Sequence, residues 1–290
     1  MIDIGRVFST SFTMLRQRFW PLVGMWAVFL AIQMAASTVL AVVMVVVGMA
    51  GVAGLGAGLE DPAAFGGLGI VMIVFMVLFY GAYIVLLLAQ QAAMVTLGSP
   101  LEEPAFGTAM NRGFRSALPF FGLSVLLVLG YFALAAAVMA VMSLASVGGG
   151  AAGGFVSGLI GLLMLPLVIW LACRLSVLVA VVAVDQVFNP ITALRRSWAV
   201  TKGKTLRILL ALAGFIGISL VALAVPFMLI FFAADMAESS PGAGIGLGIV
   251  GLLIFVPLFV VYTIYTATFT AALHCEVTEG GAERLEEVFA

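Results

Sequence analysis

The sequence predicts an all-α membrane protein with six transmembrane helices. Of its 290 residues, 64% are hydrophobic and 9% are charged, whereas a soluble protein is about 45–50% apolar and about 25% charged. Apolar runs recur along the chain, and each exceeds the ~20 residues that a helix needs to cross a ~30 Å hydrocarbon core. The runs are continuous and rich in Leu, Val, Ala and Met, unlike the short alternating segments of a transmembrane β-barrel.

The six predicted spans are grouped into three hairpins. They cover residues 19–47, 68–97, 118–147, 155–184, 206–234 and 245–274. Glycine-rich segments at 48–67, 148–154 and 238–248 join the two members of each hairpin, and longer polar segments at 98–117 and 185–205 join one hairpin to the next. A similar polar segment, 2–18, begins the chain. We therefore expect a single transmembrane domain, 1–290, that ends in a short cytoplasmic tail, 278–290.

The three polar segments resemble one another, which indicates an internal repeat. Each predicted unit consists of an interfacial amphipathic helix and a transmembrane hairpin, and the units cover 1–100, 101–186 and 187–277. In each polar segment a small residue and an aromatic residue precede the span, at Ser11-Phe12, Gly113-Phe114 and Ser197-Trp198.

Helical spacing within the polar segments predicts the three surface helices. Apolar side chains share one face at Ile4, Val7, Phe8, Phe12 and Leu15, at Phe106, Met110, Phe114 and Leu118, and at Ile191, Leu194 and Trp198. Asp3 is available as an N-cap, and Asn189-Pro190 is a typical helix start. Such helices either lie in the membrane interface or pack as ordinary linkers against the bundle. Trp20 and Trp198 are the expected interface anchors.

The distribution of basic residues predicts the orientation. Eleven of the twelve cations lie on one side of the predicted spans: ten in the polar segments or the C-terminal tail, and Arg207 at the first turn of the fifth span. The charged residues at the hairpin tips are all acidic, Glu60, Asp61, Asp235 and Glu238. The positive-inside rule therefore places both termini in the cytoplasm. We expect a multi-pass protein of the bacterial inner (cytoplasmic) membrane.

Anionic lipid is the expected partner of the basic segments, because cations beside a span meet headgroups before any other anion. For the same reason nucleic acid is not expected as a partner. The candidate headgroup-binding residues are Arg195, Arg196, Lys202, Lys204, Arg16, Arg18, Arg112 and Arg115.

Arg174 is the one cation that we expect inside the membrane, since Arg207 stands at the very start of its span. A mid-membrane arginine costs about 2.5–3.5 kcal/mol on insertion scales, so it needs a partner or a route to the headgroups. We expect it in an intramembrane polar cluster with Gln90, Gln91, Tyr265 and Asp185. The cluster has two interpretations, a lipid phosphate site and an interhelical hydrogen-bond anchor that binds no ligand.

No constellation for catalysis is recognisable. The chain has one histidine, His274, no Ser-His-acid set and no group of metal ligands at a suitable spacing. We expect no enzymatic activity, no cofactor and no metal.

One segment resembles a known bacterial family, the glycerophosphoryl diester phosphodiesterase membrane-domain family. The segment runs from Arg174 through Asp185 to Ala193–Lys204, which reads A-L-R-R-S-W-A-V-T-K-G-K. The resemblance covers about thirty residues, and Asp185 departs from the glutamate more usual there. The chain lacks the soluble phosphodiesterase barrel. The resemblance implies an integral membrane module without a catalytic centre, tied to lipids.

The function that we expect is that of a non-enzymatic membrane protein that binds lipid or partner proteins and so organises the membrane or a membrane complex. One alternative is a transporter or channel for small molecules, lipids or ions that uses Arg174. Another is an accessory subunit of a membrane enzyme or secretion complex.

Overall fold

The structure, a computed structural model, describes residues 2–55, 62–147 and 151–278, and all regular secondary structure in these ranges is helical. The helices are α1 (Ile4–Gln17), α2 (Phe19–Leu55), α3 (Pro62–Leu97), α4 (Phe106–Arg115), α5 (Ala117–Val147), α6 (Ala151–Leu175), α7 (Leu178–Ala183), α8 (Pro190–Val200), α9 (Thr205–Ser239) and α10 (Pro241–Val277). Among them, six stretches are long and apolar enough to span a membrane. The all-α class with six spans is confirmed. Glu60, Asp61 and Arg284 lie outside the described residues.

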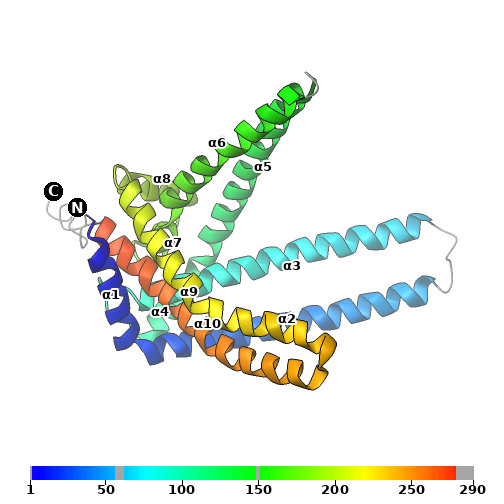
Figure 1. The fold of residues 1–290 in the computed structure, drawn as a ribbon, viewed down its shortest axis with the longest axis horizontal. Coiled ribbons are helices and arrows are strands. Elements are labelled where there is room, and N and C mark those ends of the chain that lie inside the picture. The colour runs from blue at the N-terminus through cyan, green and yellow to red at the C-terminus, as the bar shows by residue number, and fades with distance from the viewer. Residues whose placement is uncertain (1, 56–61, 148–150, 279–290) are drawn as a thin grey trace.

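The six long helices form three hairpins that diverge from a common base (Figure 1). The hairpins are α2–α3, α5–α6 and α9–α10, and the short helices α1, α4, α7 and α8 lie at the base with both ends of the described chain. Side chains buried by protein are concentrated at this base, whereas most side chains farther along the hairpins are exposed. The base therefore holds the fold together.

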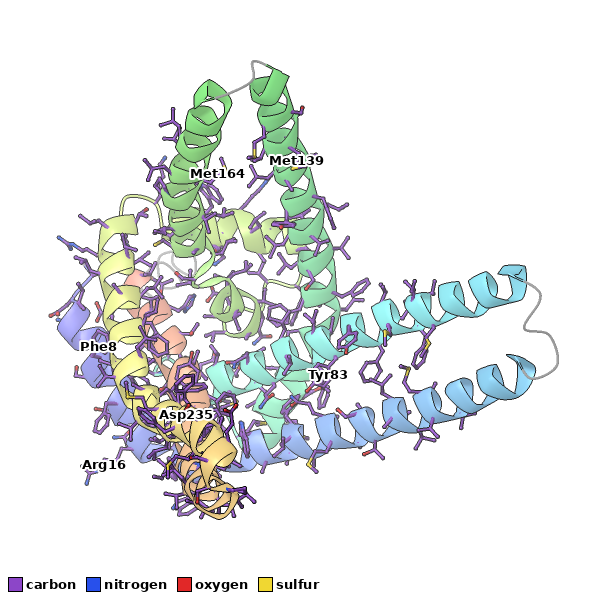
Figure 2. The ribbon with its side chains drawn as sticks, turned by 45° about the vertical axis from the view of Figure 1, so that its right-hand side comes forward. Phe8, Arg16, Tyr83, Met139, Met164 and Asp235 are labelled. Carbon is purple, nitrogen blue, oxygen red and sulfur yellow. The ribbon has the colours of Figure 1, made fainter. Side chains whose placement is uncertain are left out.

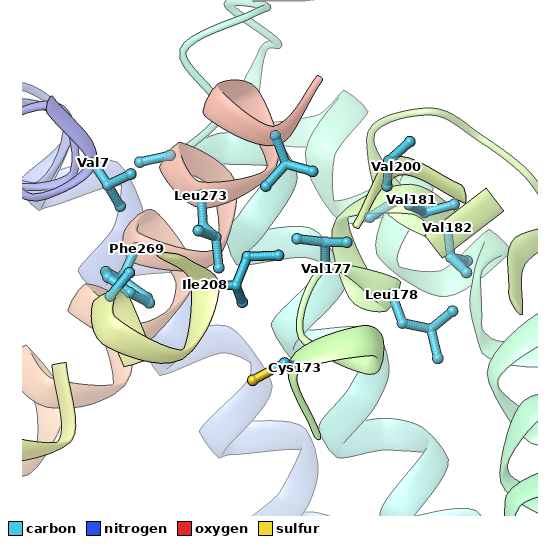
Figure 3. Close-up of a cluster of buried hydrophobic side chains, with 14 of the residues drawn as sticks. Val7, Cys173, Val177, Leu178, Val181, Val182, Val200, Ile208, Phe269 and Leu273 are labelled. Carbon is cyan, nitrogen blue, oxygen red and sulfur yellow. The ribbon is translucent and has the colours of Figure 1, made fainter. Parts of the chain in front are cut away.

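The hydrophobic core of the base lies where α1, α7, α9 and α10 meet (Figure 3). Val7 of α1, Val177 and Val181 near α7, Ile208 of α9 and Leu273 of α10 are all fully or almost fully buried there. These side chains come from all three predicted units. Packing at the base thus joins the beginning, the middle and the end of the chain.

Two of the three surface helices, α1 and α8, begin with the side-chain cap that the sequence predicts. The Asp3 side chain accepts a hydrogen bond from the Arg6 N–H at 3.2 Å, and the Asn189 side chain accepts from the N–H groups of Ile191 and Thr192. Helix α4 instead follows Ala105, which provides no side-chain cap.

The fourth predicted span, 155–184, differs from expectation because it is not one helix. Helix α6 ends at Leu175, and a separate turn of helix, α7, begins at Leu178. At the break, the Ser176 hydroxyl donates a hydrogen bond to the Cys173 carbonyl at 2.9 Å. Serine hydroxyls of this kind compete with the backbone ladder and favour helix ends. The break separates Arg174 from Asp185.

Each surface helix buries small residues against the base. Val7 and Ser11 are the buried residues of α1, Ala109 and Gly113 those of α4, and Ala193, Ser197 and Val200 those of α8. Large apolar side chains of the same helices remain exposed, including Phe12, Phe114 and Ile191. The small member of each aligned sequence pair therefore faces the protein in all three units. The threefold repeat itself stays a prediction.

Candidate functional site

Acidic residues at the ends of the hairpins pair with arginines of the surface helices. Glu102 follows the first hairpin and contacts Arg112 of α4 at 2.6 Å. Asp185 follows the second hairpin and contacts Arg196 of α8 at 2.7 Å. Glu276 ends the third hairpin and lies 3.5 Å from Arg6 of α1. Each hairpin is therefore tied to a surface helix, and the third pair returns to the first helix of the chain.

Two other cations bind the C-terminal ends of membrane helices. Arg18 Nη1 donates to the carbonyl of Leu97, the last residue of α3, at 2.7 Å. Lys204 Nζ donates to the carbonyl of Val277, the last residue of α10, also at 2.7 Å. The last carbonyls of a helix lack intrahelical donors and carry partial negative charge. Both cations therefore stabilise helix ends at the base.

Arg174 lies at the end of α6 and is 8% exposed. Its Nη1 donates to the Trp198 carbonyl in the last turn of α8 at 3.0 Å and to the Thr201 hydroxyl at 3.3 Å. In return, the Ser197 hydroxyl donates to the Arg174 carbonyl at 2.7 Å. These bonds join the surface helix α8 to the fourth span.

Two tryptophans complete the surroundings of Arg174. Its guanidinium carbon lies 5.4 Å from the ring centroid of Trp170 and 5.5 Å from that of Trp198, both within cation–π range. Arg174 forms no ion pair with a described carboxylate, and its buried Nε has no hydrogen-bond partner there. The arginine thus contacts carbonyls, a hydroxyl and aromatic rings, which fits the anchor interpretation.

Asp185 is buried between two partners, since its side chain is 5% exposed. The same oxygen, Oδ2, accepts from Arg196 Nε and lies 3.4 Å from Nε2 of the buried His274. Burial alone raises the pKa of the Asp185 carboxyl, but His274 and Arg196 together outweigh burial and hold the pKa below its ordinary value. The Arg196 guanidinium is permanently charged, so its part of this lowering does not depend on the protonation of His274.

His274 is a member of this site that sequence reasoning missed. The sequence predicts no partner for it, because Asp185 lies 89 residues earlier in the chain. Glu276, two residues further along, gave a weak signal, because like Glu102 and Asp185 it is an acidic residue close to the end of a hairpin. Among the described residues, no three His, Cys, Asp or Glu side chains come together as a metal site would require.

The residues of the predicted intramembrane cluster lie in four different places. Arg174 contacts α8, and Asp185 contacts Arg196 and His274. Gln90 accepts a hydrogen bond at 2.7 Å from Gln33 of α2, and both line a cavity with Gln91. Tyr265 stacks on Phe215 of α9, with ring centroids 5.6 Å apart. The structure therefore does not bring Arg174 together with Gln90, Gln91, Tyr265 or Asp185. The break after Leu175 directs the arginine to α8 instead.

The eight candidate headgroup residues fall into two sets. Four of them, Arg18, Arg112, Arg196 and Lys204, are held by contacts within the chain, as described above. The other four are exposed and form no hydrogen bond or ion pair with another described residue: Arg16, Arg115, Arg195 and Lys202. We call this second set the exposed cations. The sequence alone did not distinguish the two sets.

An apolar groove adjoins one of the exposed cations. Phe8, Phe12 and Leu15 of α1 form one wall, and side chains of α9 and α10 form the other, around a volume of about 430 Å³. Phe12 and Leu15 also line a neighbouring depression that contains Arg16 and Trp20. The Trp20 side chain is 77% exposed. An apolar groove and a cation therefore lie side by side along α1. Figure 2 labels Phe8 of the groove wall and Arg16 on this helix.

Comparison with known proteins does not assign the chain to a family. It matches no family model, and no curated protein or solved structure shows significant similarity to it. The resemblance to the phosphodiesterase membrane domain therefore stays a prediction.

Proposed function

We propose that this integral membrane protein is a non-enzymatic module that binds anionic lipid headgroups and partner proteins to organise a membrane region or complex. The observation that carries the proposal is the set of exposed cations on and beside the surface helices. Arg16, Arg115, Arg195 and Lys202 have no internal anion among the described residues. A lipid phosphate would supply one to each.

The surface helices have the two faces that interfacial binding requires. Their small residues pack on the protein, and large apolar side chains such as Phe12, Phe114 and Ile191 are left outside. An interfacial helix buries such side chains in the acyl boundary while its cations reach the headgroups. The groove beside Arg16 is apolar, so it could hold the acyl chain of a lipid whose headgroup phosphate contacts that arginine.

We place the base on the cytoplasmic side of a bacterial inner membrane, with both termini inside. The support is the concentration of cations in the base segments and the acidic hairpin tips, which is the asymmetry of the positive-inside rule. Anionic lipids of the cytoplasmic leaflet then face the exposed cations, each of which contributes about 1 kcal/mol near a charged surface. A protein partner would meet the same outward-facing surface.

The test is lipid selectivity after reconstitution. The protein is placed in vesicles of equal phosphatidylglycerol and phosphatidylcholine and extracted, and the retained lipids are measured by mass spectrometry. We expect the wild type to retain phosphatidylglycerol in excess. Substitution of the four exposed cations with glutamine should bring the retained ratio close to that of the bulk vesicle.

A matched control uses one cation that the structure assigns to an internal contact. Arg112→Gln removes one charge from α4 but breaks the pair with Glu102, so it should lower stability more than lipid selectivity. Arg115→Gln removes one charge from the same helix and should do the reverse. Equal phosphatidylglycerol retention by the wild type and the fourfold variant would contradict the proposal.

A further inference from the structure

The hairpin α2–α3 and helix α10 enclose a cavity lined by uncharged polar side chains. Its volume is about 480 Å³, within the range of pockets that hold small ligands. Three glutamines, Gln33, Gln90 and Gln91, contribute to the lining together with Tyr83 and Tyr262. Trp26 and Phe259 add aromatic surface. Tyr83 can be located on α3 in Figure 2.

The cavity lies at membrane depth. Gln90 precedes the end of α3 by seven residues and Tyr83 by fourteen, which corresponds to roughly 10 and 21 Å along the helix axis. Both residues belong to a stretch that is long and apolar enough to span the membrane. Polar side chains at such depth are costly and normally mark a functional pathway or site.

The two central amides use only part of their hydrogen-bonding capacity on each other. Gln33 Nε2 donates to Gln90 Oε1 at 2.7 Å, although the two side chains are only 9% and 5% exposed. A primary amide has two donor hydrogens and an acceptor oxygen. The Gln33 oxygen, the Gln90 nitrogen and the whole Gln91 amide therefore have no partner among the described residues. None of these unpaired atoms is fully buried, so each is open to a ligand or to water.

The lining selects the charge of a ligand. It contains no Lys, Arg, Asp, Glu or His, so a charged headgroup would find no counter-ion there. An uncharged group with hydrogen-bonding oxygens would bind the amides, and its planar or aliphatic part would contact the aromatic rings. A hydrophobic tail could follow the apolar helices into the bilayer.

We propose that this cavity binds the head of an uncharged lipid that carries carbonyl or hydroxyl oxygens, such as a quinone or a diacylglycerol. Gln33, Gln90 and Gln91 supply the hydrogen bonds, and Trp26, Tyr83 and Phe259 supply the contact surface. The site is distinct from the exposed cations. It does not depend on their binding of anionic lipid.

Native mass spectrometry of the detergent-solubilised full chain tests the proposal with ubiquinone-2 and dioleoylglycerol as separate probes. The mass of the bound probe shows whether the quinone or the diacylglycerol binds. We expect one of the two to bind at one copy per chain and to resist displacement by phosphatidylglycerol. The double substitution Gln33→Leu and Gln90→Leu replaces both amides with apolar side chains of comparable size. It should reduce the bound fraction about tenfold, the effect of losing one or two hydrogen bonds.

Ser219→Ala is the matched control, because Ser219 is a polar residue within span α9 that lines the neighbouring grooves and not this cavity. It should leave probe binding unchanged. If the double variant does not fold, the test uses Gln91→Leu, which removes a single amide that has no partner among the described residues. This variant should also reduce the bound fraction of the probe. Absence of binding by both probes, equal binding by the glutamine variants, or displacement by phosphatidylglycerol would each overturn the proposal. None of these outcomes depends on the lipid selectivity of the exposed cations.

Discussion

Glu276 at the end of α10 lies 3.5 Å from Arg6 in α1, so the last membrane helix is paired with the first helix of the chain. The Asp3 N–H also donates to Glu276 Oε2, at 3.5 Å. Asp185 and Arg196 form the corresponding pair between the second hairpin and α8. The two pairs have the same role in the topology but differ in burial. The Arg6 side chain is 67% exposed, whereas that of Arg196 is 25% exposed and that of Asp185 only 5%.

The difference in burial predicts different costs for removing each carboxylate. Glu276→Gln should lower the stability by less than about 1 kcal/mol, because exposed pairs are screened by solvent. Asp185→Asn should cost about 1–3 kcal/mol, because it leaves a charged donor with a weaker acceptor in a buried place. Thermal unfolding in one detergent measures both. A larger loss for Glu276→Gln than for Asp185→Asn would contradict this assignment.

Asp185 also predicts an acid-side dependence of stability. Its pKa is lower in the folded protein than its ordinary value of about 3.9, so folding favours the charged carboxylate. This contribution is fully present above the ordinary pKa and is lost as the pH falls from there through the lower folded value. The wild type should therefore lose more stability than Asp185→Asn below about pH 4. Parallel pH profiles of the melting temperature would exclude a role for Asp185.

The sequence was sufficient for the helical framework. Long apolar runs determine where spans lie, because the bilayer requires about 20 apolar residues whatever the tertiary structure. The start of α8 could also be predicted from the sequence, because Asn189 and Pro190 stabilise the first turn through local contacts. The break between Leu175 and Leu178 was not predicted. Arg174 and Ser176 are polar, but the apolar run continues on both sides of them and no glycine or proline stands at the break.

The candidate site was predicted only as a list of residues. Sequence position places Arg18, Arg112, Arg196 and Lys204 in the same class as the exposed cations, since all are basic and close to a span. What separates them is the position of acceptors on other helices, such as the Leu97 and Val277 carbonyls. Gln33 was missed for the same reason. Its partner Gln90 is 57 residues away, and the two meet only when α2 packs on α3.

Gly113 lies where α4 packs tightly on α3, and it predicts opposite effects of two alanine substitutions within one helix. A Cβ at this position would lie 2.7 Å from both the Ala89 carbonyl oxygen and the Ala93 Cβ. Gly113→Ala should therefore displace α4 and cost about 1–3 kcal/mol. Gly107→Ala in the same helix meets no atom within 4 Å and should stabilise by up to about 1 kcal/mol. Thermal unfolding of the two variants should give shifts of opposite sign; shifts of the same sign would contradict the packing of α4 on α3.

Arg174 should not be replaceable by lysine. Lysine keeps the charge but lacks the planar guanidinium that lies against Trp170 and Trp198 while donating to the Trp198 carbonyl. Arg174→Lys should lower the melting temperature and shift the tryptophan emission, because the surroundings of both indole rings change. Arg195→Lys on the neighbouring exposed face is the control and should alter neither. Unchanged emission in Arg174→Lys would argue against the contact between the arginine and the two rings.

The orientation can be tested at two exposed residues on opposite ends of the long helices. Lys202 lies at the base and Glu238 near the tip of the α9–α10 hairpin. In a background with Cys173→Ala and Cys275→Ala, a membrane-impermeant maleimide applied to intact cells should label Glu238→Cys and leave Lys202→Cys unmodified until the membrane is opened. The expectation follows from the sorting of cations toward the cytoplasm. Labelling of Lys202→Cys in intact cells would show the opposite orientation. The exposed cations would then face the outer leaflet instead of the anionic cytoplasmic leaflet.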